Sequence, residues 1–412
     1  MKRRIAGMSM AVMSIVQGCR YGPVEMDRQL NGTRQEWTGG GTERPGETGN
    51  PDDGNPETPK ELYITGVEYP EGYDWRHSIG TNDDIGKLFL MKGKERIMEL
   101  PVGQGNCISS DADMHRCIGG HLYTDFSTDT ETVIKCDGTE RFRYSGREMI
   151  ADMAVITGEV HTLGMPRSGN GLTYRINGNI IIHKRNAVLM SGFHQSGKDL
   201  FFSCVEPSGS SAGAPAEYYI IRNGTENMIQ PPADAIGIDD ARIIDGKLCM
   251  TARMRWGTAY SFIQGSHTTP YQIRNGYSIS GCRIIYGGGN IFTFGEAVSG
   301  YRQEGWIWSN GYIVASTDGM TKSCGVCADR ENIYMISNPA TDDAVATIYD
   351  GSRSVSLPAG YGCIYNDGIG SHNGHCCAII SNRYAGNKPA LWEDGVITEH
   401  SFNGCFTSVS FW

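Results

Sequence analysis

One phrase recurs along the chain, and its clearest copy is Trp306-Ile307-Trp308-Ser309-Asn310-Gly311-Tyr312-Ile313-Val314. An apolar run enters a two-residue turn, and a second apolar run leaves it. Asn-Gly allows both central residues the positive φ that a type I′ turn requires, and the twist of that turn matches the right-handed twist of the paired strands. The phrase therefore predicts a β-hairpin.

Seven further turns match this phrase. They are Lys92-Gly93, Asp137-Gly138, Asn177-Gly178, Asn223-Gly224, Gln264-Gly265, Asp350-Gly351 and Asp394-Gly395. Successive turn glycines lie about 40 to 46 residues apart, which is the period of a propeller blade built from four short strands. We therefore predict an all-β fold, a β-propeller of eight four-stranded blades. Seven blades is the alternative if the weak repeat at residues 150–185 is absorbed elsewhere.

The repeat region begins and ends with an incomplete repeat. It starts at the second strand of a blade with Glu61-Leu62-Tyr63-Ile64, and it stops after an inner strand that runs from Gly404 to Phe411. Pairing these two strands would complete one shared blade, close the ring and remove the exposed edges that promote aggregation. We predict that residues 61–412 form the propeller domain.

The N-terminus has the features of a secretory signal. Lys2-Arg3-Arg4 precedes an apolar run from Ile5 to Val16, which is shorter than the roughly 20 residues of a membrane-spanning helix. Gly18-Cys19 resembles a bacterial lipoprotein cleavage site, although Gln17 departs from the small residue usual there. We predict a signal peptide at residues 1–19 and a lipid on Cys19, with ordinary secretion as the alternative. The protein would then be extracytoplasmic, at the outer membrane or the cell surface.

Residues 20–60 are rich in Gly, Thr, Pro, Glu and Asp. Such a segment buries too little apolar surface to offset the entropy of ordering it, so we predict a flexible linker. The formal net charge is -10 and no basic run is present, which argues against nucleic acid as a partner. We expect a monomer whose contact with a membrane is made only through the lipid.

Five of the thirteen cysteines recur at one place in the repeats, in or just before the inner strand: Cys107, Cys282, Cys324, Cys363 and Cys405. Equivalent points on neighbouring blades should lie about 10 Å apart, whereas a disulfide needs Cα atoms about 4.4 to 6.8 Å apart. We predict that these thiols are packing residues. Cys324-Gly325-Val326-Cys327 has the CxxC spacing, but a strand directs the two side chains to opposite faces, and no second CxxC is present. No cofactor and no metal site is predicted.

The lipoprotein-like start, the Asn-Gly hairpins that follow Trp or Tyr, and Leu-Tyr phrases such as Leu62-Tyr63 and Leu122-Tyr123 carry a family resemblance. Over residues 61–412 the chain resembles the secreted β-propeller lipoproteins common in Bacteroidetes and, more loosely, NHL and kelch propellers. The resemblance implies the fold. It does not imply one activity, because propellers include enzymes, lectins and scaffolds.

The loops that join strands two and three of each blade are long, and in a propeller they share one face with the loops that join strand four to the next strand one. Long loops on a rigid scaffold are the usual place for binding. The predicted binding residues on these loops are Tyr73, Trp75, Arg76, Arg253, Arg255, Trp256, Tyr301, Arg302, Arg383 and Tyr384. Aromatic rings stack on sugars or side chains, and Arg offers a planar fork to carboxylates. Ordinary packing of the loops is the competing interpretation for each residue, and Trp256 is the strongest single candidate.

A catalytic interpretation needs acids, or histidines with acids, that converge at the channel. The candidates are Asp111, Asp113, His115, His194, Asp239, Asp240, Arg242, Asp329, Arg330, Asp367, His372 and His375. Aspartates at strand ends more often cap turns, and no spacing here is specific for an enzyme class. The sequence favours a binding protein for a glycan or a protein partner. A glycoside hydrolase or polysaccharide lyase with acids at the channel mouth, and a structural subunit of a surface assembly, are the alternatives.

Overall fold

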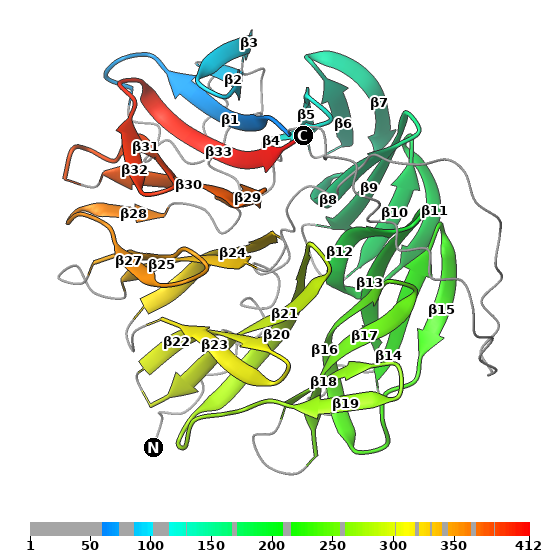
Figure 1. Ribbon diagram of the computed structural model, residues 1–412. Coiled ribbons are helices and arrows are strands. Elements are labelled where there is room, and N and C mark those ends of the chain that lie inside the picture. The colour runs from blue at the N-terminus through cyan, green and yellow to red at the C-terminus, as the bar shows by residue number, and fades with distance from the viewer. Residues whose placement is uncertain are drawn as a thin grey trace, which may run out of the picture.

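The computed structural model describes residues 60–73, 86–101, 115–128, 130–166, 171–208, 216–255, 260–300, 302–317, 321–329, 332–339, 345–363, 368–382 and 384–412. All secondary structure in these ranges is β-strand, in eight antiparallel sheets arranged as a ring (Figure 1). The chain is therefore an eight-bladed β-propeller, as predicted, and the seven-bladed alternative is wrong. The predicted signal peptide, Cys19 and residues 20–59 of the linker lie outside the described residues. Within the described ranges, no helix has the length and apolar character needed to cross a membrane.

The first four blades are numbered by their order around the ring. Blade 1 contains β1 (Leu62–Tyr69), β2 (Lys87–Lys92), β3 (Glu95–Pro101) and β33 (Asn403–Phe411). Blade 2 contains β4 (His115–Ile118), β5 (His121–Ser127), β6 (Glu131–Cys136) and β7 (Thr139–Ser145). Blade 3 contains β8 (Glu148–Ile156), β9 (Glu159–Pro166), β10 (Leu172–Ile176) and β11 (Asn179–Lys184). Blade 4 contains β12 (Val188–Ser196), β13 (Asp199–Pro207), β14 (Ala216–Arg222) and β15 (Thr225–Ile229).

The remaining blades follow the same order. Blade 5 contains β16 (Ala235–Ile244), β17 (Lys247–Met254), β18 (Tyr260–Gln264) and β19 (His267–Pro270). Blade 6 contains β20 (Ser278–Gly287), β21 (Asn290–Ser299), β22 (Arg302–Ser309) and β23 (Tyr312–Ser316). Blade 7 contains β24 (Thr321–Asp329), β25 (Asn332–Pro339), β26 (Thr347–Tyr349) and β27 (Ser354–Ser356). Blade 8 contains β28 (Tyr361–Cys363), β29 (Ile369–His372), β30 (His375–Asn382), β31 (Lys388–Glu393) and β32 (Val396–Glu399), with β28 and β29 both paired to β30 as two parts of the inner strand.

The two ends of the propeller share blade 1, as predicted. Strand β33 pairs antiparallel with β1, from Leu62 opposite Phe411 to Tyr69 opposite Asn403. Figure 1 shows the red C-terminal strand β33 beside the blue β1. Because the first and last parts of the repeat region hydrogen-bond to each other, β33 covers the inner edge of β1 and the shared blade closes the ring.

Five of the eight predicted turns have the expected backbone. Their first residues have φ from 46° to 51° and their glycines φ from 77° to 95°: Asp137-Gly138, Asn177-Gly178, Asn223-Gly224, Asn310-Gly311 and Asp394-Gly395. In four of them the side-chain oxygen of the Asn or Asp also accepts a hydrogen bond from a backbone N–H of the second strand, at 2.8 or 2.9 Å: Asp137 from Leu122, Asn177 from Val160, Asn223 from Leu200 and Asp394 from Cys376. The polar residue before the glycine thus forms the turn between strands three and four, and its side chain also binds this turn to strand two of the same blade.

Three predicted turns differ from this pattern. Strand β2 ends at Lys92, so Gly93 (φ 57°) is the first turn residue and not the second, which is the arrangement of type II′ turns. Gly265 (φ 59°) after β18 is placed in the same way. Asp350 and Gly351 belong to a four-residue connection between β26 and β27. The sequence therefore located these turns correctly and misjudged their register, because glycine meets the φ requirement at either central position.

The core consists of contacts between the facing sheets of neighbouring blades. Trp306 and Trp308 are fully buried and face the cluster that contains Tyr271 and Ile279, whereas Ile307 between them faces the cluster of Ile333. Side chains alternate across a strand, so one strand packs against both neighbouring blades. Such a strand needs apolar residues at successive positions, and this accounts for the continuous apolar run Trp306-Ile307-Trp308.

The ten cysteines whose thiols the structure describes form no disulfide with one another. Cys282, Cys363 and Cys405 are buried packing residues in inner strands, as predicted. Cys107 lies outside the described residues, as does the side chain of Cys324. Cys327 donates from Sγ to Ser371 Oγ at 3.2 Å across the boundary of blades 7 and 8.

Candidate functional site

The two predicted sets of loops do meet on one face, which we call the loop face. Tyr384 lies in the connection between β30 and β31 of blade 8, and Gly360 lies in the connection that enters the same blade from blade 7. A Cβ atom on Gly360 would lie 2.5 Å from Cδ2 of the Tyr384 ring, so the ring rests against the glycine. The backbone N–H of Arg255 likewise donates to the carbonyl oxygen of Asp234 at 2.7 Å, which joins the corresponding loops of blade 5.

Tyr384 is the most exposed aromatic residue among those that the structure describes, with 76% of its surface accessible. Its loop is nevertheless ordered by local hydrogen bonds. The side-chain oxygen of Asn382 accepts from the backbone N–H groups of Tyr384 (3.2 Å) and Ala385 (3.3 Å). An Asn side chain that binds the backbone two and three residues onward holds the chain in a turn. The Cγ–Cδ2–Cε2 side of the ring therefore rests against Gly360, while most of the side chain stays open to solvent.

The carboxylate of Glu399 anchors this loop to the outer strand β32. It accepts hydrogen bonds from Asn382 Nδ2 at 2.9 Å, from Lys388 Nζ at 3.0 Å and from the hydroxyl of Tyr361. These hydrogen bonds, from Asn382, Tyr361 and Lys388, stabilise the charged form and lower the pKa of Glu399 to about 2. The loop that presents Tyr384 is thus held in position by one exposed acid with three partners.

The other predicted binding residues that the structure describes are spread over separate blades of the same face. Tyr73, in the loop after β1, is half-buried, and its ring lies 5.3 Å from that of Tyr69, so it packs as a loop anchor. Arg253 is exposed and its Nε lies 3.2 Å from Asp239 Oδ1. Arg255 and Arg302 are exposed. Trp75, Arg76, Trp256, Tyr301 and Arg383 lie outside the described residues, so their positions on this face stay predictions.

The acids proposed for catalysis hold neighbouring blades together. Asp240 Oδ2 accepts from the backbone N–H of Ile284 at 2.7 Å, and Asp239 Oδ2 accepts from that of Cys282 at 3.1 Å; both bonds cross from blade 5 to blade 6. Asp329 Oδ2 accepts from the N–H of Gly374 at 2.6 Å, between blades 7 and 8. Burial raises the pKa of Asp239 and of Asp240. The bonds to Asp239 and Asp240 satisfy the backbone donors of two buried residues, Cys282 and Ile284, at a blade boundary.

The histidines of that set have different roles, and His194 joins blades 4 and 5. His194 Nε2 accepts from the N–H of Ile243 at 3.0 Å, and burial, with the Arg242 charge nearby, lowers the pKa of His194 to about 3. His372 packs with its ring 6.1 Å from the ring of Phe411. His375 Nδ1 lies 2.8 Å from Asp394 Oδ2 on an exposed turn. His115 is buried, and Arg242 Nε lies 3.4 Å from Asp240 Oδ2 on its own strand. The remaining candidates lie outside the described residues: Asp111, Asp113, Arg330 and Asp367.

Sequence reasoning missed one further blade-to-blade contact. Asp152 of β8 is fully buried; its Oδ1 lies 2.5 Å from Arg116 Nη1 of blade 2, and its Oδ2 accepts from the N–H of Phe193 of blade 4 at 2.7 Å. One carboxylate therefore joins three blades. Asp152 is the only charged residue in the apolar run Met149-Ile150-Ala151-Asp152-Met153-Ala154. A charged residue in such a run could have indicated a buried polar contact.

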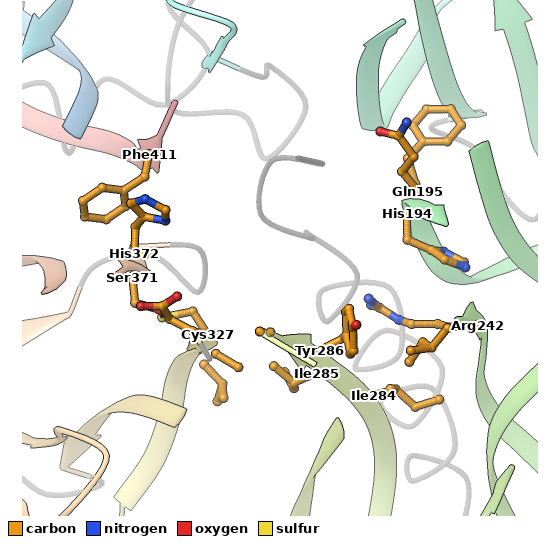
Figure 2. A pocket seen from close by; sticks show the side chains of 18 of the residues that line it. His194, Gln195, Arg242, Ile284, Ile285, Tyr286, Cys327, Ser371, His372 and Phe411 are labelled. Atoms are coloured by element: carbon orange, nitrogen blue, oxygen red, sulfur yellow. Dashed lines mark hydrogen bonds between the residues drawn. The ribbon is translucent and has the colours of Figure 1, made fainter. Parts of the chain in front are cut away.

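The opposite end of the central channel contains a cavity of about 510 Å³. Its walls are the turn ends of β12, β16, β20, β24, β29 and β33. Figure 2 shows Arg242 and Tyr286 reaching into it from neighbouring strands, with His372 and Phe411 on the far wall. The size is typical of a ligand pocket. Its charged lining is mixed, however, with Lys60, Arg242 and Arg283 beside Asp245 and Asp329, and this composition indicates no ligand class.

Comparison with known proteins places the chain by fold. No protein-family model matches it, and no curated protein does. Among solved structures it is similar to dihydro-heme d1 dehydrogenase NirN, with a TM-score of 0.52 and 9% identity over 85% of this chain and 74% of that one. It is also similar to the β-propeller domain of the Trilobed protease from Pyrococcus furiosus, with a TM-score of 0.41 and 12% identity over 66% of this chain and 86% of that one. At these identities the likeness shows the propeller fold alone.

Proposed function

We propose that this chain is a non-catalytic binding protein that recognises a glycan on its loop face. Tyr384 is the residue that we assign to this binding surface. The observation that carries the proposal is the 76% exposure of Tyr384 on a loop that is held in place. A flat aromatic ring with one open face is suited to stack on a sugar ring, and a ring that is already positioned loses little entropy on binding.

The surroundings of the channel support binding over catalysis. Asp239, Asp240 and His194 accept hydrogen bonds from backbone N–H groups of the next blade. A glycosidase needs two carboxyl groups that reach the substrate, one of them as a proton donor. Acids that hold blades together are poorly placed for that chemistry.

We further propose that the protein is a monomeric, extracytoplasmic lipoprotein of the kind found in Bacteroidetes, held at the outer membrane or cell surface through Cys19 and the linker. The motif Gly18-Cys19 supports this part. In a host that processes lipoproteins, Cys19→Ala is expected to move the protein from the membrane fraction to the soluble fraction. Unchanged membrane association of that variant would refute the lipid anchor.

The binding proposal is tested with the purified full chain on affinity gels that contain a panel of polysaccharides. Retardation by at least one glycan is expected, without release of reducing or unsaturated ends. Tyr384→Ala should abolish most of the retardation. Tyr312→Ala is the matched control, because Tyr312 is also 70% exposed but lies at an Asn-Gly turn on the opposite face.

Each other outcome rejects a stated part of the proposal. Equal retardation of the Tyr384→Ala and wild-type proteins would reject this ring as the stacking surface. Product release would show an enzyme. No retardation by any glycan, together with capture of one stoichiometric protein from the cell envelope, would show a protein-binding or surface-assembly role.

A further inference from the structure

A compact group of three metal-binding residue types lies in blade 2, on the face opposite the proposed glycan site. His121 begins β5, Cys136 ends β6, and Asp137 is the first residue of the turn that follows. One ligand atom from each residue lies within 4.8 Å of the others. The side chains of His121 and Asp137 are 61% and 30% exposed, so an ion in solvent has access to them.

The hairpin backbone holds Asp137 in place. Its backbone N–H donates to the carbonyl oxygen of Leu122, and its Oδ1 accepts from the N–H of Leu122, both at 2.8 Å. Its other oxygen, Oδ2, lies 2.6 Å from His121 Nδ1. A ligand side chain that is already held in position loses little conformational freedom when it binds a metal.

Blade 8 contains the same arrangement without the thiol. His375 Nδ1 lies 2.8 Å from Asp394 Oδ2, and Asp394 Oδ1 accepts from the N–H of Cys376 at 2.8 Å. The residue before Asp394 is Glu393, where blade 2 has Cys136. Among the described residues only the blade 2 group brings three such ligand atoms together. The His-Asp pair therefore occurs in blades 2 and 8, and the cysteine is what distinguishes blade 2.

We propose that His121, Cys136 and Asp137 bind a zinc ion. Imidazole nitrogen, thiolate sulfur and carboxylate oxygen are the ligands that Zn²⁺ takes in proteins, and three protein ligands leave the fourth tetrahedral position to water. On binding, the Cys136 thiol releases its proton to solvent, and the neutral imidazole of His121 carries its proton on Nε2. Zinc ligands stand about 3.3 Å apart at metal–ligand distances of about 2.0 Å, so the exposed His121 ring needs only a small rotation away from Asp137.

Neighbouring side chains influence the affinity of this site for zinc. The phenol of Tyr123 and the cation Arg141 also face Cys136. The cation opposes a second positive charge, whereas Asp137 favours it. The sequence alone did not indicate this site, because its ligands are brought together only by the β5–β6 pairing, in which Tyr123 lies opposite Cys136.

The test is a titration of the metal-free full chain with Co²⁺, followed by competition with Zn²⁺. We expect saturation at one equivalent, a thiolate-to-cobalt charge-transfer absorption, and loss of that absorption when zinc displaces cobalt. In Cys136→Ser the absorption should vanish and zinc affinity should fall roughly 10-fold or more, since even residues that only orient a ligand contribute that much. His375→Ala, at the matching position of blade 8, should bind like the wild type.

Urea unfolding of each variant without metal shows whether the fold is intact, and His121→Ala provides a second variant that leaves every thiol in place. Two results would overturn the proposal. One is an equal charge-transfer absorption in the wild type and in folded Cys136→Ser, which would place the metal on another cysteine. The other is binding that does not saturate at one equivalent, which would show an adventitious ion only.

Discussion

Tyr312 and Tyr384 are almost equally exposed, at 70% and 76%, but they lie on opposite faces and are positioned by different means. Tyr312 follows the Asn310-Gly311 turn, whose glycine packs against backbone: a Cβ there would lie 2.5 Å from the carbonyl oxygen of Pro270 in blade 5. Tyr384 rests on Gly360 through its ring and is held by side chains around Glu399. At these two positions the turn-face glycine thus meets the backbone of a neighbouring blade, whereas the loop-face glycine meets a side chain.

This difference indicates which face can acquire a binding function at low cost. A substitution at Gly311 meets the backbone of Pro270 in the neighbouring blade, which cannot easily move. A substitution at Gly360 meets the side chain of Tyr384, which can move. The residue on this loop can therefore change without loss of the fold. Four predictions test this contrast.

The largest effect on stability is expected at Asp152, where a buried carboxylate binds a side chain and a backbone N–H of two neighbouring blades. Asp152→Ala leaves the buried guanidinium of Arg116 without its carboxylate and the N–H of Phe193 without its acceptor. We expect the free energy of unfolding to fall by about 3 to 5 kcal/mol, as for other broken buried ion pairs. Urea unfolding measures it. Asp394→Gly, at an exposed turn where Asp394 has φ 46°, keeps the backbone freedom, is the control and should lose about 1 kcal/mol.

The next prediction compares two glycines with similar backbones, Gly311 (φ 82°) and Gly360 (φ 92°). Alanine at either position costs roughly 1 to 2 kcal/mol in backbone strain. At Gly311 the new methyl also meets the rigid Pro270 backbone, so the total loss should reach about 2 to 4 kcal/mol. At Gly360 the Tyr384 ring can swing away, so stability should fall by little more than the strain while glycan retardation is lost.

The same pair of variants can break the contrast. Equal losses of stability at the two glycines, or Gly360→Ala with unchanged retardation, would show that the loop face is not organised by the Tyr384 contact. Urea unfolding and the affinity gels measure the two quantities on the same preparations.

A smaller effect is expected at the hairpin of blade 3. Asn177 has φ 49° and its Oδ1 accepts from the N–H of Val160 at 2.9 Å. Asn177→Gly keeps the backbone freedom and loses only the hydrogen bond, about 1 kcal/mol. Asn177→Ala loses both and should be less stable than the glycine variant in thermal unfolding. The reverse order would show that the φ requirement does not control this turn.

The smallest effect concerns Glu399 and depends on pH. Its pKa is lowered to about 2, so its contribution to stability is fully present above its ordinary value of 4.5 and is lost as the pH falls through about 2. We expect wild type to be more stable than Glu399→Gln at pH 7, and the difference to disappear between about pH 4.5 and pH 2. Urea midpoints of both proteins across this range measure it, and a gap that stays constant with pH would contradict the assignment.

The local signals were sufficient for the architecture. Asn-Gly and Asp-Gly turns at a regular spacing, with apolar runs on both sides, led to eight blades and to the shared blade of β1 and β33. The registers at Gly93 and Gly265 were misjudged because glycine is compatible with two turn types, and only the strand ends distinguish them. Of the predicted binding residues, the sequence selected Tyr384 by residue type and loop position, without any indication of what holds it.

What the sequence determined by itself is therefore the repeat: its period, its hairpins and the closure of the ring, because these depend on contacts between residues that are close in the chain or on complementary ends. Only the tertiary structure decided the roles of the polar residues. Asp152 meets Arg116 and Phe193 across two blade boundaries, Tyr384 meets Gly360 from another connection, and Cys136 meets His121 across a hairpin. Each of these contacts depends on the exact register and packing of strands, which residue type and spacing do not encode.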